Sequence, residues 1–360
     1  LKITNLLNKI EKSKKPLIIA GGGDWDKYGA KDLEHFANAN KIPYAVSFRR
    51  QSIVNNNNNY YIGDLSTSVD PKLINSVKES DLILVVGARL GEMTTGGYTT
   101  IKPNQKNKII HVYPDKKELG KVYKPIIGIK ANSSIFSKMI KDKKIKNIKW
   151  ERWSNSCRKN YIEYSTPPKY SSEPDMGKIM LILREYMPKN TIITIDAGNF
   201  SGWIQRFWKY TQMKTQLAPT SGAMGYSIPA AISAKIAKKS APVIAFCGDG
   251  GFMMSSQELA TCNQYKIKPI IIIINNKMLG TIRMHQEKHY PKRKIATDLV
   301  NPDFKVLSKS YNAHYENIKN HKQFLKALKR SIAANKAAVI EIEVDPQQIT
   351  TRQKMKDLNQ

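Results

Sequence analysis

The sequence is poor in acidic residues and in cysteine, and it contains no long hydrophobic run. Its 360 residues include 29 Asp and Glu against 59 Lys and Arg, which gives a formal net charge of +30. The three cysteines (Cys157, Cys247 and Cys262) provide neither a disulfide framework nor the paired spacing of a metal site. No apolar stretch is long enough to cross a membrane, and no signal peptide is visible. These absences predict a cytoplasmic protein without membrane association.

The excess of lysine raises nucleic-acid binding as a function class. The lysines are spread along the chain, as in 141–149 and 235–239, and arginine is sparse. No basic stretch is interleaved with the aromatic residues that a stacking platform for nucleic acid requires. A general bias toward Lys, Asn and Ile, visible in the run of asparagines at 55–59, favours solvated surface charge and no nucleic-acid partner. Polyanion binding is the alternative, and it predicts an affinity for DNA or RNA that falls steeply with salt.

Two sets of short apolar runs predict two α/β domains, a number that suits a chain of this length. The runs at 16–20, 81–87 and 109–112 alternate with helical patterns at 32–39 and 71–78. The second set lies at 191–196, 243–247, 270–274 and 339–344. Strands that alternate with helices indicate doubly wound parallel sheets.

The domain boundaries follow from these runs and from the composition between them. We expect a Rossmann-like central domain over 1–145 and a second doubly wound domain over 175–346. A lysine-rich, proline-containing segment over 146–174 is interpreted as a linker that carries a helix at about 150–161, and 347–360 as a C-terminal tail.

Glycine, aspartate and asparagine follow two neighbouring runs of the second set. Gly248-Asp249-Gly250 follows 243–247, and Asn275-Asn276 follows 270–274. Open α/β sheets bind ligands at the carboxyl ends of their strands, and glycine lets the backbone approach a ligand closely. A carboxylate and a carboxamide at this edge suit Mg²⁺, which takes oxygen ligands and is often shared with phosphates. The spacing therefore predicts a magnesium-bound diphosphate.

The segment after the glycines predicts the start of a helix. Ser255-Ser256-Gln257-Glu258 fits a capping box, so we expect a helix from about Ser255 to Tyr265 whose N-terminus faces the glycine turn. Helix N-termini favour phosphate. Glu258 is then interpreted as the capping partner and not as a catalytic base.

These motifs resemble those of the thiamine-diphosphate-dependent enzymes. The pattern GDG-x24-NN is similar to that family's cofactor motif. The segment from Thr220 to Tyr226 (TSGAMGY), followed by Pro229-Ala230-Ala231, is similar to the one that holds the aminopyrimidine in the acetolactate synthase group. Residues 2–140 resemble the central domain of that group. The resemblance covers nearly the whole chain and implies thiamine diphosphate and Mg²⁺ as cofactors of the second domain.

The resemblance also implies a role for each residue of the motif. Asp249 and Asn276 would supply side-chain oxygens to Mg²⁺, and Met278 its backbone carbonyl. The backbone at Gly248, Gly250 and Gly251 would lie against the diphosphate, with the last two glycines as N–H donors.

Two residues of the second motif are similar to those that shape the cofactor. Met224 resembles the bulky apolar residue that bends thiamine diphosphate and so brings its 4′-amino group near C2 of the thiazolium ring. Gly222 would offer its carbonyl to that amino group. The alternative for Met224 is ordinary core packing.

Two further segments depart from the pattern of the acetolactate synthases. The turn with Gly198 and Asn199 carries Gln and His side chains that reach the diphosphate in that group; Asn199 keeps a donor here, whereas Phe200 has none. His285 aligns with a tryptophan that helps to select the acceptor substrate. Histidine titrates near neutrality, so His285 is either an acid–base group or an ordinary surface histidine.

The resemblance implies partners as well. A preceding pyrimidine-binding domain, which carries the glutamate that protonates the aminopyrimidine, is expected to be missing, so the chain is expected to form part of a longer protein. The active sites of the family form between subunits, which implies a homodimer or homotetramer. Some members hold FAD in the central domain, where Gly21-Gly22-Gly23, Gly87, Arg89 and Asp115 would lie near it, and others leave that domain empty.

Three functions remain open. The first is decarboxylation of a 2-keto acid followed by carboligation, as in acetolactate synthase. The second is a 2-keto-acid or acyl-CoA decarboxylase, or a carbon–carbon lyase, on the same scaffold. The third, of another class, is a non-catalytic cofactor-binding fragment.

Overall fold

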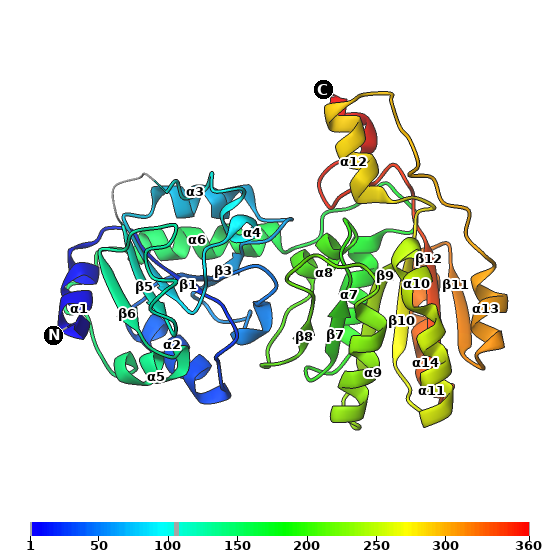
Figure 1. The fold of residues 1–360 in the computed structure, drawn as a ribbon, viewed down its shortest axis with the longest axis horizontal. Coiled ribbons are helices and arrows are strands. Elements are labelled where there is room, and N and C mark those ends of the chain that lie inside the picture. Colours follow the sequence, from blue (N-terminus) through cyan, green and yellow to red (C-terminus); the bar gives the residue numbers. More distant parts are fainter. Residues whose placement is uncertain (1, 104–107, 360) are drawn as a thin grey trace. The chain divides into compact units, whose positions relative to one another are not determined.

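The computed structural model describes residues 2–103 and 108–359 and divides into two compact units, each built on a six-stranded sheet (Figure 1). The first unit comprises 1–166 and 209–213, and the second comprises 167–208 and 214–360. All strand pairs within the two sheets are parallel. The expected fold class, two doubly wound α/β domains, is therefore confirmed.

The first sheet has the strand order β3-β2-β1-β4-β5-β6, the order of a Rossmann fold. Its strands are β1 (Pro16–Ala20), β2 (Tyr44–Val46), β3 (Tyr61–Asp64), β4 (Leu82–Val86), β5 (Ile109–Tyr113) and β6 (Ile127–Lys130). The three predicted runs correspond to β1, β4 and β5, which are buried on both faces, as parallel strands between helical layers should be. Strands β2, β3 and β6 lie outside the predicted runs.

The described part of the first unit contains seven helical segments: α1 (Lys2–Lys12), α2 (Lys27–Ala39), η1 (Gln51–Ile53), α3 (Pro71–Glu79), α4 (Glu92–Thr95), α5 (Ser133–Ile140) and α6 (Glu151–Tyr164). Helix α6 is the helix expected within the linker. It packs on β3 and α3, and Trp150 at its start is fully buried, so it forms part of the first unit's fold. The second unit begins after it, at 167.

The second sheet has the strand order β11-β12-β10-β9-β7-β8. Its strands are β7 (Ile192–Ile195), β8 (Gln216–Leu217), β9 (Val243–Gly248), β10 (Ile270–Asn275), β11 (His314–Ile318) and β12 (Ala338–Glu343). The chain leaves β7 for β8 on one side and returns to β9 on the other. The sheet therefore has a topological switch point between β7 and β9, where ligands of open α/β sheets bind.

The helical segments of the second unit are α7 (Met176–Tyr186), α8 (Ser201–Phe207), α9 (Ser227–Ala237), α10 (Asp249–Ser255), η2 (Ser256–Glu258), α11 (Leu259–Tyr265), α12 (Gly280–His289), α13 (Phe304–Ser310), η3 (His321–Gln323), α14 (Phe324–Ala333) and η4 (Met355–Asn359). Helix α12 stands beyond the carboxyl ends of the strands and contacts η4 (Figure 1).

The predicted start of a helix at Ser255 is wrong. Strand β9 passes directly into α10 at Asp249, so the glycine motif is itself the first turn of a helix. Ser255 makes no side-chain capping bond, and Glu258 instead accepts a hydrogen bond from Thr261 Oγ1 at 2.9 Å. The predicted end at Tyr265 is correct. None of the helices in the described part of the chain is long and apolar enough to span a membrane.

Candidate active site

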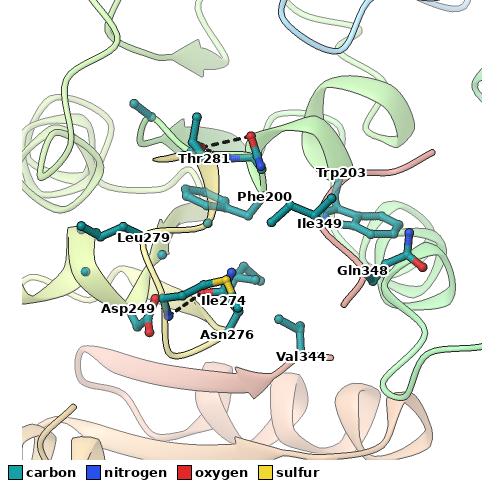
Figure 2. A pocket seen from close by; sticks show the side chains of 18 of the residues that line it. Phe200, Trp203, Asp249, Ile274, Asn276, Leu279, Thr281, Val344, Gln348 and Ile349 are labelled. Atoms are coloured by element: carbon teal, nitrogen blue, oxygen red, sulfur yellow. Dashed lines mark hydrogen bonds between the residues drawn. The ribbon is translucent and has the colours of Figure 1, made fainter. Parts of the chain in front are cut away.

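The carboxyl ends of β7, β9 and β10 open into a cavity of about 250 Å³ in the second unit (Figure 2). Ten of the eleven predicted site residues line it: Gly198, Asn199, Gly222, Met224, Gly248, Asp249, Gly250, Gly251, Asn276 and Met278. They come from four separate segments of the chain. The structure thus brings the two sequence motifs together at the switch point.

Asp249, the first residue of α10, is the buried carboxylate of this cavity. It is 1% exposed, and its Oδ2 accepts a hydrogen bond from Asn301 Nδ2 at 2.8 Å. Burial raises the pKa of Asp249 above its ordinary value, and the hydrogen bond from Asn301 only partly offsets that rise. A buried carboxylate without a neighbouring positive charge is stabilised by a bound cation, because attraction to the cation compensates for the hydration that burial removes.

Asn276 and Met278 also line the cavity, and Figure 2 shows Asn276 on the same side as Asp249. Asn276 Oδ1 accepts a hydrogen bond from the backbone N–H of Met278 at 3.2 Å. Met278 forms an antiparallel bridge with Asp298, flanked by Leu279 N–H to Thr297 O at 2.8 Å and Leu299 N–H to Lys277 O at 2.9 Å.

The flanking bonds make Met278 and Asp298 a non-hydrogen-bonded pair. The backbone N–H and C=O of Met278 therefore both face away from segment 297–299, and the N–H bonds to Asn276. Only the backbone takes part, so the identity of residue 278 gives no signal in the sequence.

Two glycines of the motif, Gly250 and Gly251, have little room for a side chain. A Cβ on Gly250 would lie 3.1 Å from Leu279 Cδ2 and 3.2 Å from Leu299 Cδ1, and one on Gly251 would lie 2.5 Å from Asp196 Oδ2. The first N–H groups of a helix have no intrahelical partner and carry the positive end of its dipole. The start of α10 therefore offers donors to an anion in the cavity.

Met224 lies on a loop that Asp196 ties to the end of β7. Asp196 is fully buried; its Oδ2 accepts a hydrogen bond from Gly225 N–H at 2.9 Å and its Oδ1 one from Ser227 N–H at 2.5 Å. Ala197 N–H also bonds to Ala223 O at 3.2 Å. Met224 Cε consequently lies 3.5 Å from the Cβ position of Gly250, across the cavity.

Gly222 and Asn199 both line the cavity, but only Gly222 is unobstructed there. Gly222 has a φ of +75° and open space around its Cβ position, so its backbone is accessible. The Asn199 carboxamide is already engaged with α12: its Oδ1 accepts from Thr281 Oγ1 at 3.0 Å, and its Nδ2 lies 3.6 Å from Met284 Sδ. Gly198 is held against the Phe200 ring, whose Cε1 lies 2.6 Å from a Cβ built on the glycine.

His285 is the one predicted site residue that the structure does not bring to the cavity. It is exposed on α12 and stacks on His289, with ring centroids 6.1 Å apart and an interplanar angle of 5°. Gly280, Thr281 and Ile282 of the same helix line the cavity, but His285 does not. The structure supports the interpretation of His285 as a surface histidine.

Several lining residues were missed by the sequence reasoning. Trp203 of α8 and the C-terminal residues Val344, Gln348 and Ile349 form a largely apolar wall across the cavity from Asp249 (Figure 2). They lie far from both motifs in the sequence. A tail had been expected over 347–360, yet two of its residues belong to this wall.

A buried polar chain lies behind Asp249. Asn301 Nδ2 also donates to Asn275 Oδ1 at 3.1 Å, and Asn275 Nδ2 donates to Glu341 Oε1 at 2.6 Å. Glu341 Oε2 in turn accepts a hydrogen bond from the Tyr315 hydroxyl. The first asparagine of the Asn-Asn pair therefore faces this chain, and the second faces the cavity.

The donor set fits magnesium bound together with a diphosphate. Across residues 2–103 and 108–359, no three His, Cys, Asp or Glu residues gather as a metal site. An ion here would rest on one carboxylate, one carboxamide oxygen and one carbonyl, with its other positions left for phosphate or water. Mg²⁺ is commonly held in that way.

Comparison with known proteins agrees with this geometry. The model for the C-terminal TPP-binding domain of thiamine pyrophosphate enzymes matches residues 196–342, and the model for their central domain matches 3–140. The chain is 31% identical over 361 residues to a probable acetolactate synthase large subunit of Methanocaldococcus jannaschii, covering 96% of this chain and 60% of that protein.

Two other relatives have the same kind of name. The acetolactate synthase large subunit of Lactococcus lactis is 29% identical over 91% of this chain and 57% of its own length. The acetolactate synthase isozyme 2 large subunit of Escherichia coli is 25% identical over 93% of this chain and 61% of its own length. The chain spans about 60% of the length of the curated relatives it matches. It belongs to the thiamine pyrophosphate enzymes, and it carries their central and C-terminal cofactor-binding domains.

Proposed function

We propose that this chain is the cofactor-holding part of a thiamine-diphosphate- and Mg²⁺-dependent enzyme that decarboxylates a 2-keto acid and joins the remainder to a second carbonyl compound, as acetolactate synthase does. One observation carries the proposal. Buried Asp249 begins α10, and Asn276 and Met278 line the same cavity at the carboxyl ends of the strands. This arrangement would suit a cation held by oxygen ligands beside an anion.

The chain's residues would act by binding and orienting the cofactor. Asp249, Asn276 and Met278 would hold Mg²⁺, and the N–H groups of Gly250 and Gly251 would face the diphosphate. Met224, held by the Asp196 clamp, would pack against the middle of the cofactor and fix its shape. Thiamine diphosphate held there would supply a nucleophilic carbon and an electron sink for the decarboxylation.

The apolar wall bears on the substrate class. Trp203 and Ile349 would exclude water from the side of the cavity opposite Asp249, and Gln348 is the polar side chain among them. A small 2-keto acid with an apolar chain suits such a surface. The alternative, a plain 2-keto-acid or acyl-CoA decarboxylase or a carbon–carbon lyase, uses the same residues. Product analysis with pyruvate separates them, because ligation yields acetolactate and protonation yields acetaldehyde.

The first unit does not fit the diphosphate of FAD at its β1–α2 turn. A Cβ on Gly22 would lie 2.1 Å from the carbonyl oxygen of Gly87, so the backbones of the two glycine segments lie close together at the ends of β1 and β4. Asp24 accepts hydrogen bonds from Ser133 N–H and Oγ at 2.8 and 2.7 Å, and Asp26 caps α2. Two carboxylates beside a helix N-terminus repel a phosphate, so FAD is not part of the proposal.

The test is a calorimetric titration of thiamine diphosphate into the protein, with Mg²⁺ and with EDTA. Wild type is compared with Asp249→Asn and with Asp303→Asn. The second variant removes the same charge from an exposed cap of α13, where asparagine caps equally well. We expect magnesium-dependent binding that is lost in Asp249→Asn and kept in Asp303→Asn.

A second arm separates an enzyme from a non-catalytic fragment. The titration and the pyruvate assay are repeated with the pyrimidine-binding domain of an acetolactate synthase fused ahead of the chain. Binding without turnover by the chain alone, with turnover restored in the fused form, would support the fragment. Absence of binding in both forms would refute the thiamine proposal.

A further inference from the structure

A second cavity, of about 1020 Å³, lies at the opposite edge of the second sheet. Its floor includes Val243 and Ile270, the first residues of β9 and β10, whose other ends carry the glycine motif and the asparagine pair. The C-terminal ends of α7, α9, α11 and α14 surround it, and Figure 1 shows α9 and α11 reaching this lower edge of the unit. No residue lines both cavities.

The charge of this cavity has one sign. Five lysines line it (Lys235, Lys239, Lys266, Lys268 and Lys336), and no Asp or Glu does. Among the described residues, none of the five forms an ion pair with a carboxylate. The pKa of Lys235 is lowered, first by its partial burial and then by the like charge of Lys268. Lys235 and Lys268 therefore repel each other, and no carboxylate lines the cavity to offset their charge.

The helix dipole explains only part of this arrangement. Lysines are common near helix C-termini, because their positive charge is attracted to the negative end of the helix dipole. That preference does not exclude acidic residues from the surrounding loops, and it does not create a cavity. Two of the lysine ammonium groups also donate hydrogen bonds to uncharged oxygens: Lys235 Nζ to Ala241 O at 2.8 Å and Lys268 Nζ to Asn335 Oδ1 at 2.5 Å.

Apolar and aromatic groups form the rest of the wall. Ile236 and Ile332 are 56% and 46% exposed, and Tyr186 and Tyr265 are 43% and 65% exposed. All four line the cavity. Exposed apolar side chains gathered beside cations offer a surface for a molecule that has both an apolar body and a negative charge.

A buried hydroxyl supplies an independent observation. Ser331 of α14 lines the cavity and is only 2% exposed, yet its Oγ has no hydrogen-bond partner within the described part of the chain. A buried polar group of this kind normally finds a partner. A ligand oxygen in the cavity would provide one.

We propose that this cavity binds a soluble organic anion, a carboxylate or phosphate with an apolar or aromatic body, at a site separate from the cofactor cavity. The lysines would neutralise the anionic group, and the isoleucines and tyrosines would cover the body. The Ser331 hydroxyl would bond to an oxygen of the ligand. The proposal does not depend on the proposed enzymatic function.

The test uses 8-anilinonaphthalene-1-sulfonate, a fluorescent aromatic anion, titrated into the full chain. Wild type is compared with Lys268→Glu/Lys336→Glu at the cavity and with Lys305→Glu/Lys309→Glu on the exposed face of α13, which changes the net charge equally. We expect saturable binding of one probe at this site, weakened roughly tenfold in the cavity variant and less than twofold in the control. Ser331→Ala should weaken it about threefold.

Two further arms keep the result interpretable. Thiamine diphosphate with Mg²⁺, at concentrations just sufficient to saturate the cofactor cavity, should not displace the probe, because the two cavities share no lining residue. The neutral analogue N-phenyl-1-naphthylamine should bind more weakly and should not respond to the lysine substitutions. Equal weakening in both double variants, or displacement of the probe by thiamine diphosphate, would overturn the proposal.

Discussion

Replacing Asp196 by asparagine should weaken cofactor binding even though this residue is expected not to touch the cofactor. Both carboxylate oxygens of Asp196 hold backbone N–H groups of the loop that carries Met224. Asparagine keeps one acceptor oxygen, and its amide nitrogen would face the other N–H group. A longer side chain would not fit, because Gly251 already approaches Oδ2 closely.

The size of the effect follows from the bond that is lost. A hydrogen bond to a buried charged acceptor contributes about 1.5–3 kcal/mol. If that energy holds the loop in its binding conformation, its loss weakens thiamine diphosphate binding by about ten- to 150-fold. The free energy of unfolding should fall by a similar amount.

The assay is the magnesium-dependent calorimetric titration, with chemical unfolding measured on the same samples. Thr194→Val is the matched control, since Thr194 Oγ1 donates to Ser227 O at 2.7 Å in the same region but does not hold Gly225. It should lower the free energy of unfolding by about 1 kcal/mol and leave the affinity within threefold. An Asp196→Asn variant that is less stable but binds the cofactor normally would refute the clamp.

Four other perturbations test the site. Asn301→Ala should weaken Mg²⁺ binding by about ten- to 100-fold, because Asp249 loses the hydrogen bond that orients it. The control Asn317→Ala should bind Mg²⁺ like wild type, and equal Mg²⁺ affinities of the two variants would contradict this prediction. Gly250→Ala should destabilise the protein by about 1–3 kcal/mol through contact with Leu279 and abolish cofactor binding, as melting and calorimetry would reveal. Because the pKa of Asp249 is raised, the metal-free protein should lose stability as pH rises through that pKa, and Mg²⁺ should restore it. The melting temperatures measured with EDTA and with Mg²⁺ should therefore differ more as the pH rises. A difference that does not change with pH would contradict this prediction for Asp249. His285→Ala should leave pyruvate turnover of the fused protein within twofold of wild type, and a larger loss would return His285 to the active site.

The strands at the centre of both sheets were predictable because their sequences are almost wholly apolar. Ile270–Asn275 and Leu82–Val86 are buried on both faces, and burial on both faces removes the alternation that marks a half-exposed strand. The edge strand β11 (His314–Ile318) was missed because it is mostly polar and only partly buried. Its Tyr315 donates to Glu341 in the polar chain behind Asp249, whereas its Glu316 pairs with Arg330.

The sequence predicted the site residues that belong to a local motif at a strand end. It did not predict those that reach the site only through contacts between distant segments. The glycine motif and the asparagine pair are close in the sheet because β9 and β10 are neighbours. Asn301 and Asp196 carry no comparable local signal, since their role depends on loops that fold back onto the strand ends. The capping pattern at Ser255 misled because the strand enters its helix six residues earlier, at Asp249.

The wall formed by Val344, Gln348 and Ile349 has a consequence for how the protein is made. These residues follow Asn276 by up to 73 positions (276 to 349). A ribosome adding 5–20 residues per second takes about 4–15 s to cover that stretch. During this interval the nascent chain has the proposed metal ligands but lacks one wall of the cavity, so cofactor binding as proposed here would wait for a segment well beyond the glycine motif and the asparagine pair.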